Sequence, residues 1–425
     1  MNKNIAKFLL FLFSFFLLIG ELYPQVKLLI PMDLSQTDHL KAYGIAYRHL
    51  MKNLELDWLL NYRGGSFMFQ FSDNIQNECD SKGVYYEKLD GTQTAQVYAF
   101  VEDEKNNTDV VRLEKVAKIA VYVPPNALPW DDAVRLVLEY AEIPYDKLWD
   151  EEVLQDKLKD YDWVHLHHED FTGQYGKFFA SFATTDWYMI QKKTNEDMAK
   201  KLGYSKVSKL KLAVVQKLQE YVANGGFLFA MCSATDTYDI ALASQYTDIC
   251  DVMYDGDPID PKANEKLDFT KCIAFQDFII EMNPYIYEYS NIDVTYDILN
   301  IGQWNDYFTL IDFSAKLDPV PTMLNQCHTA LVHGFMGQTS GFRKELIKKN
   351  VTILSLNENT NLVRYLHGNY GKGTFTFYGG HDPEDYQHLV GAPATVLSKF
   401  PNSPGYRLIL NNVLFPAAKK KKLKT

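Results

Sequence analysis

The sequence predicts an α/β protein with a doubly wound, mostly parallel, flavodoxin-like sheet that is interrupted by an irregular insertion. Largely apolar runs have the length of buried strands at residues 118–123 (KIAVYV), 163–167 (WVHLH) and 227–231 (FLFAM). Amphipathic helical periodicity separates these runs, most clearly over residues 131–141 and 207–222. Apolar strands that alternate with helices are typical of a parallel sheet covered on both faces.

Length and charge restrict the class of protein. The 425 residues are 47% hydrophobic and 23% charged, which suits two or so globular domains and excludes a disordered, collagen-like or coiled-coil chain. The formal net charge is −11, from 43 Lys+Arg and 54 Asp+Glu. A nucleic-acid partner is not expected, because nucleic-acid binding requires a cationic surface.

The N-terminus has the pattern of an export signal. Lys3 and Lys7 precede an uncharged apolar run at residues 8–19, which is shorter than the roughly 20 residues that span a bilayer. We expect residues 1–24 to be a signal peptide and the protein to be exported, periplasmic or extracellular. The cleavage site and an uncleaved anchor stay open, and no later segment is predicted to cross a membrane.

The N-terminal part predicts a βαβ unit. Residues 27–32 and 56–62 have the pattern of strands, and residues 39–54 between them have helical periodicity. The pattern then weakens over residues 67–111, which predicts an irregular, β-rich excursion.

Farther along, the chain divides into a core, an insertion and a completion of the core. A Tyr-, Asp- and Asn-rich stretch of weak periodicity predicts the insertion or lid, and residues 362–367 and 374–378 predict the arms of a hairpin. The expected segments are a signal peptide at 1–24, the N-terminal subdomain at 25–115, the first part of the α/β core at 116–245, the insertion at 246–321, the core completion with a terminal helix at 322–416, and a basic tail at 417–425.

One cysteine lies where a nucleophile is expected. Cys232 directly follows the strand at 227–231 and precedes a predicted helix at 238–243. A thiol on a tight turn between a strand and a helix resembles a nucleophile elbow, where backbone N–H groups such as that of Ser233 can hold an oxyanion. A buried structural thiol is the alternative, since the chain has five scattered cysteines and at least one must be unpaired in a monomer.

A histidine follows a later strand. His381 comes after the strand at 374–378, and Asp382 and Glu384 follow it. An imidazole with a nearby carboxylate can serve as the base for a thiol nucleophile and as the orienter of that base. The alternative is a loop in which Asp382 and the next residue, Pro383, start a helix.

A histidine-rich stretch runs off the strand at 163–167. Alternation along the strand places His165, His167 and Glu169 on one face and His168 on the other, so the first three could bind a divalent metal ion. A polar pocket wall or a base for the thiol is the alternative. Arg63, in the glycine-rich loop after the second strand, could hold an anion, with a plain turn as the alternative.

The segments around Cys232 and His381 resemble the class I glutamine amidotransferase-like superfamily. This likeness extends over residues 118–415 and implies a flavodoxin-like sheet, with Cys232 as nucleophile, His381 as base, and Glu384 or Asp382 as orienter. The chain departs from the family pattern in two places: alanines flank the elbow, and residues 168–173 replace the Pro-Gly-Gly of the oxyanion loop. Gly173 could still offer a backbone donor.

Four segments also resemble a group of secreted bacterial proteins often labelled asparagine synthetase B. The chain has neither the N-terminal cysteine nor the Ser-Gly-Gly-x-Asp-Ser loop that this activity requires, so its motifs do not support the label. The matching segments are residues 27–33, 39–44, 58–66 and 167–173.

Two classes of function follow. The first is an exported Cys-dependent hydrolase or amidase that acts on an amide or related acyl bond. The second is a non-catalytic protein that binds a sugar, a peptide or another small molecule in a pocket with His167, His168 and Glu169. A metal hydrolase centred on His165 is a third hypothesis, and neither of the first two requires a cofactor.

Overall fold

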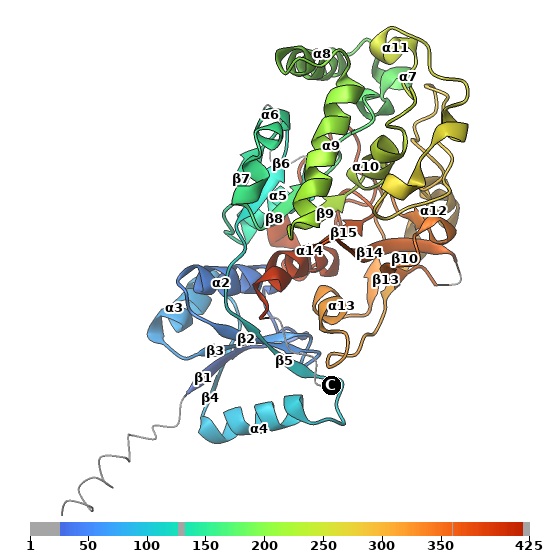
Figure 1. Ribbon diagram of the computed structural model, residues 1–425. Helices are drawn as coiled ribbons and strands as arrows, with labels where there is room; N and C mark the ends of the chain where they lie inside the picture. Colours follow the sequence, from blue (N-terminus) through green and yellow to red (C-terminus); the bar gives the residue numbers. More distant parts are fainter. Residues whose placement is uncertain (1–25, 126–131, 359, 420–425) are drawn as a thin grey trace, which may run out of the picture.

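The computed structural model describes residues 26–125, 132–358 and 360–419, which fold around two β-sheets (Figure 1). The predicted signal peptide and residues 420–425 of the basic tail lie outside the described residues. Within those ranges, no helix combines the length and the hydropathy needed to cross a bilayer.

The N-terminal sheet is entirely antiparallel. Its strands pair in the order β4-β1-β3-β2-β5. They are β1 (Lys27–Ile30), β2 (Leu56–Leu60), β3 (Ser66–Gln70), β4 (Glu87–Leu89) and β5 (Asp109–Leu113). The loop at residues 61–65 is too short for a crossover, so β3 turns back and pairs with both β2 and β1. The predicted βαβ unit is therefore split by an antiparallel strand.

Helices cover both faces of this sheet. Leu28 and Ile30 of β1 belong to the core that includes α2 (His39–Met51), whereas Leu29 packs with Val101 of α4 (Gly91–Glu102). Two helices, α3 (Asp73–Lys82) and α4, occupy the stretch that was expected to be irregular and β-rich.

The second sheet combines a parallel half and an antiparallel half. Strands β7 (Asp146–Leu148), β6 (Ile119–Tyr122), β8 (Trp163–Leu166), β9 (Phe227–Met231) and β15 (Gly373–Tyr378) are parallel neighbours in this order. Five strands pair antiparallel beyond β15, namely β14 (Leu362–Tyr370), β13 (Val351–Leu356), β10 (Tyr307–Leu310), β11 (Leu331–His333) and β12 (Phe342–Arg343).

The predicted doubly wound, mostly parallel, flavodoxin-like sheet with an irregular insertion is therefore wrong. Strand and helix alternate regularly only as far as β9, and the strands from β11 to β15 follow one another through short connections without an intervening α-helix. Tyr370 pairs with Gly373 across a two-residue turn, for example, and such a turn can join only antiparallel strands. The insertion predicted at 246–321 also contributes β10 to the sheet.

Two layers of helices enclose the large sheet (Figure 1). One face packs against α5 (Ala133–Tyr140) and α14 (Pro404–Leu414), and the other packs against α6 (Asp150–Leu154), α9 (Val207–Ala223) and α10 (Ala234–Ala243). The remaining helices are α7 (Phe179–Phe182), α8 (Asp186–Lys201), α11 (Val252–Asp255), α12 (Thr295–Ile301) and α13 (Pro319–Leu324).

Helix α14 joins the two sheets because it shares a hydrophobic core with α2. Its Arg407 is fully buried and donates hydrogen bonds to the carbonyl oxygens of Met32 (2.8 Å) and Gly64, in the N-terminal sheet domain. It also donates to the Tyr43 hydroxyl (3.2 Å). Arg407, near the C-terminus, thus provides hydrogen-bond donors for backbone carbonyls near the N-terminus.

We expect Arg407→Leu to lower the free energy of unfolding by about 2–4 kcal/mol, because the carbonyls of Met32 and Gly64 and the buried hydroxyl of Tyr43 each lose a donor. Urea denaturation followed by fluorescence measures this difference. Arg343→Leu, at an arginine whose ion pair with Asp297 is partly exposed (side chains 32% and 45% exposed), is the matched control and should change stability by less than about 1 kcal/mol. Equal losses in the two variants would contradict the bridging role of Arg407.

Candidate functional site

Cys232 occupies a strained turn at the carboxyl end of β9. The strand ends at Met231 and α10 begins at Ala234, so only Cys232 and Ser233 connect them. Cys232 has a φ of 54°, in the left-handed region, which costs a non-glycine residue about 1–2 kcal/mol. This geometry agrees with the elbow predicted from the sequence and holds the thiol at the edge of the sheet.

Backbone N–H groups surround the sulfur. Cys232 is 1% exposed, and its Sγ accepts a hydrogen bond from the N–H of Gln338 at 3.3 Å. Burial raises the pKa of the thiol to about 11, although bonds from the backbone of Thr339, Gln338 and Ser233 act in the opposite direction. The resting side chain is therefore a protonated thiol at neutral pH.

A loop from the C-terminal half closes over this sulfur. A Cβ at Gly337 would lie 2.9 Å from Sγ and 2.9 Å from the backbone nitrogen of His381, so only glycine fits there. The hydroxyl of Thr339 donates to Asp236 Oδ1 (2.9 Å), and the N–H of Ser340 donates to Asp293 Oδ1 (2.9 Å).

Both of these carboxyl groups are buried. Burial raises the pKa of Asp236 well above its usual value, and it raises that of Asp293 to about 6. Asp293 belongs to the segment predicted as an insertion or lid, so that segment helps to fix the loop above Cys232. Neither aspartate was singled out from the sequence.

Five of the ten histidines of the chain gather beside this elbow. The ring centres of neighbouring pairs are 5.6 Å apart for His165 and His167, 5.0 Å for His167 and His168, 4.4 Å for His167 and His381, 5.5 Å for His168 and His381, and 4.3 Å for His381 and His388. We call these five residues the histidine cluster. It brings together the two histidine segments that the sequence analysis treated separately.

Asp132 lies against one end of the cluster. The ring of His165 bonds through Nδ1 to the carbonyl of Phe229 (3.1 Å), so this nitrogen carries the proton. Its Nε2 is 3.4 Å from Asp132 Oδ1, and His167 Nδ1 is 3.9 Å from the same oxygen. Burial raises the pKa of Asp132, but His165 and the N–H of Arg135 outweigh this and hold it below its usual value.

His167 is a neutral imidazole in this environment. It is 2% exposed, and burial lowers its pKa well below its usual value, with further lowering from His168 and His165. A neutral imidazole has a lone pair available for a proton or a metal ion.

The carboxylates predicted to orient His381 have other partners. Asp382 accepts hydrogen bonds from the hydroxyls of Tyr406 (2.8 Å) and Thr395 (2.7 Å). Burial raises the pKa of Glu384, while a hydrogen bond from Ser403 acts against this. His388, the other late histidine, has a carboxylate close to its ring, since its Nδ1 lies 3.0 Å from Asp385 Oδ2.

The predicted metal ligands His165, His167 and Glu169 do not assemble as one set. The described residues contain two overlapping groups whose ligand atoms lie within 4.8 Å of one another, His167/His168/His381 and Asp132/His165/His167. Strand β8 ends at Leu166, so the alternation that would separate His168 from His167 stops before it reaches them. Burial raises the pKa of Glu169, and nearby Lys211 acts against this.

Gly173, the predicted backbone donor, lies beside α9. It has a φ of 84°, and a Cβ there would come within 2.7 Å of the backbone nitrogen of Ser208, so it packs against the first turn of α9. This contact explains why glycine is needed at position 173 without any role for its N–H at Cys232.

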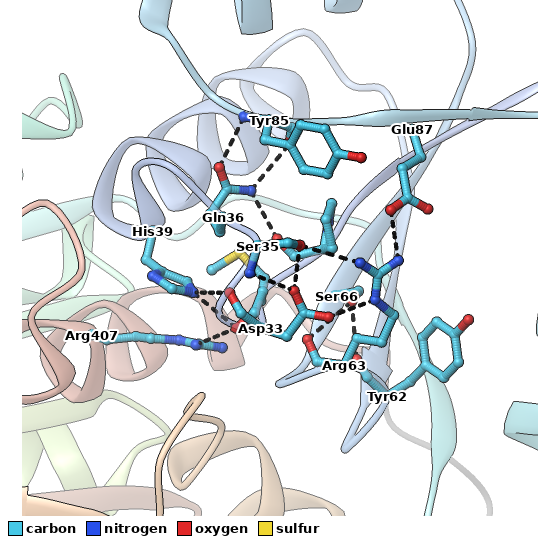
Figure 2. A network of polar contacts seen from close by, with 12 residues as sticks. Asp33, Ser35, Gln36, His39, Tyr62, Arg63, Ser66, Tyr85, Glu87 and Arg407 are labelled. Atoms are coloured by element: carbon cyan, nitrogen blue, oxygen red, sulfur yellow. Dashed lines mark hydrogen bonds and ion pairs between the residues drawn. The ribbon is translucent and has the colours of Figure 1, made fainter.

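Arg63 belongs to the N-terminal sheet domain and binds carboxylates rather than leaving a cradle for an anion (Figure 2). Its guanidinium bonds to Asp33 (2.6 Å) and to Glu87 (2.8 Å), and Ser35 accepts a third bond (3.2 Å). Arg63 has a φ of 47° at the start of the turn that returns the chain to β3. Its surroundings therefore favour the structural alternative, a turn fixed by ion pairs.

No protein-family model matches the chain, and no curated protein matches it. Two solved cytoplasmic proteins, from Salmonella typhimurium and Salmonella typhimurium LT2, are 10% and 12% identical to it. Each alignment covers 71% of this chain and 100% of the other, with a TM-score of 0.34. An exo-β-1,4-mannosidase from Opitutaceae bacterium strain TAV5 is 12% identical over 72% of this chain and 37% of its own, with a TM-score of 0.28. Similarities this weak carry no argument about function.

We expect alkylation of Cys232 by iodoacetamide to be slow at pH 7 and to rise with pH toward half of its maximal rate near pH 11, in line with the raised pKa. Mass spectrometry of the Cys232 peptide gives the rate, and urea-unfolded protein, whose thiols have their ordinary pKa, is the control. Since the folded-state pKa is the higher one, this thiol also reduces stability as pH rises through about 9 to 11. A half-maximal rate below pH 8 in the folded protein would contradict the assigned environment.

Proposed function

We propose that this protein is an exported hydrolase that cleaves amide or related acyl bonds with Cys232 as its nucleophile. The observation that carries the proposal is the position of Cys232, on a turn with positive φ between β9 and α10, with backbone N–H groups directed at its sulfur. The lysines and apolar run at the N-terminus support export, and the residues around Cys232 and His381 support the resemblance to the class I glutamine amidotransferase-like superfamily.

The resting thiol needs a base, because its pKa of about 11 leaves little thiolate at neutral pH. The histidine cluster supplies two candidates, His381 and the ring stacked on it, His388. His388 has the arrangement of an oriented base because Asp385 lies 3.0 Å from its Nδ1.

The reaction follows two steps. Sγ attacks the carbonyl carbon while its proton passes to an imidazole, and the amine or alcohol leaves with that proton. Water then hydrolyses the thioester and restores the thiol. Backbone N–H groups at Ser233, Gln338 and Thr339 are the donors available to a negative charge that develops at this position.

A second candidate function is binding without catalysis, of a sugar, a peptide or another small molecule. The observation in its favour is the 1% exposure of Cys232 beneath the loop at residues 337–339. Binding that is equal in the wild type and in Cys232→Ala, with no turnover in either, would select this alternative.

We expect Cys232→Ala to reduce hydrolysis of p-nitrophenyl acetate and of amino-acid p-nitroanilides by on the order of 10³-fold or more, because no other group can form the thioester. Cys79→Ala, which removes a buried thiol in the N-terminal sheet domain, is the matched control and should keep its activity. His388→Gln and His381→Gln identify the base as the variant with the larger loss in kcat. Unchanged turnover in Cys232→Ala of wild-type stability would overturn the proposal.

A further inference from the structure

We infer that His167, His168 and His381 bind a divalent transition-metal ion of the zinc class. This inference goes beyond the proposed function, because thiol chemistry at Cys232 does not require a metal. The three rings come from the end of β8 and from the loop after β15, which are far apart in the sequence and adjacent in the structure.

The spacing of the rings matches a site with three imidazole ligands. Their ring centres are 5.0, 4.4 and 5.5 Å apart, and one nitrogen of each lies within 4.8 Å of the others. In a tetrahedral site with Zn–N bonds of about 2.0–2.1 Å, the ring centres of three ligands are roughly 5 Å apart. The three rings therefore have the separation that a common ion requires.

The hydrogen bonding of His167 gives an independent indication that this site binds a ligand. Neither Nδ1 nor Nε2 of His167 has a hydrogen-bond partner among the described residues, although the side chain is 2% exposed. An unsatisfied buried polar group carries a free-energy cost, because it has lost its water partners without replacement. A metal ion on one nitrogen removes that cost, and the other nitrogen then faces Asp132 Oδ1 at 3.9 Å. A carboxylate behind a metal-bound histidine is a common arrangement that orients the ring.

The overlapping group Asp132/His165/His167 is a weaker candidate for the same ion. Asp132 Oδ1 already accepts hydrogen bonds from the N–H groups of Val134 (2.9 Å) and Arg135 (3.1 Å), as the N-cap of α5. Backbone donors therefore already stabilise this carboxylate oxygen, which makes Asp132 a weaker ligand candidate than the third imidazole of the other group.

The donor set indicates the class of ion. Imidazole nitrogens suit zinc, copper, iron and nickel, whereas calcium and magnesium prefer oxygen ligands. Three protein ligands leave a fourth position for water or a substrate oxygen, as in catalytic zinc sites. If the proposed function also holds, His381 is a ligand in the metal-bound protein, and His388, oriented by Asp385, is the candidate base.

The test uses the full-length protein, stripped with a chelator and reloaded with Zn²⁺ or Co²⁺. We expect one equivalent of zinc per chain by elemental analysis. The Co²⁺ form should show the visible absorption of a tetrahedral site without a thiolate charge-transfer band. His167→Ala, His168→Ala and His381→Ala should each weaken zinc affinity by more than about 100-fold. His333→Ala, outside the cluster, is the matched control and should bind zinc like the wild type.

Two further variants separate the possible outcomes. Cys232→Ala should bind zinc like the wild type. Loss of turnover in this variant, with zinc still bound, would then be due to the missing nucleophile and not to a missing metal ion. His165→Ala should reduce affinity far less than His381→Ala, and the reverse order would overturn the ligand assignment. Zinc well below one equivalent in wild-type protein after reloading would overturn the inference and leave the proposed function standing.

Discussion

The parallel register of β8, β9 and β15 is the constraint on which the candidate site depends. Leu166 is level with Ala230, and Tyr378 is level with Met231. Neighbouring strands lie about 4.8 Å apart, so the residues that follow these positions must meet at one edge of the sheet. His167, Cys232 and the loop to His381 are therefore brought together by backbone pairing alone.

The rest of the site consists of groups that fix these three strand ends. The loop at residues 337–340 is held by hydrogen bonds to Asp236 of α10 and to Asp293. Gly337 allows that loop to touch both Sγ and the backbone of His381. Because these supports come from segments distant in sequence, a change in any of them acts on Cys232 without contacting a substrate.

The sequence predicts where several strands end, but it does not predict the order and direction of the strands in the sheet. Apolar runs locate β6, β8 and β9 well, and the residues that follow β9 and β15 lie in the candidate site. The mixed topology is not predicted, because the strand–helix alternation before residue 231 favours parallel strands, although the connections after residue 350 are short enough for antiparallel pairing. Cap signals for α3 were present, with Ser72 before the helix and Gly83 (φ 69°) after it.

The partners of the site residues could not be predicted in the same way. Glu169 was assigned to a face by extending strand alternation beyond Leu166, where β8 ends. Asp132, Asp385 and His388 lie outside strands, so no periodicity directs them toward one another. Their proximity is a property of tertiary packing, and only the folded chain reveals it.

The thiol of Cys232 and the histidine cluster differ in their exposure to solvent. Sγ of Cys232 is covered by the backbone at Gly337 and Gln338, whereas His168, at the other side of the cluster, is only half-buried. A small ligand can therefore contact the histidine cluster before the loop over Cys232 moves. A substrate carbonyl can reach the sulfur only after the loop at residues 337–340 has shifted. Because Asp236 and Asp293 hold this loop, their hydrogen bonds determine the free energy that is needed to open it.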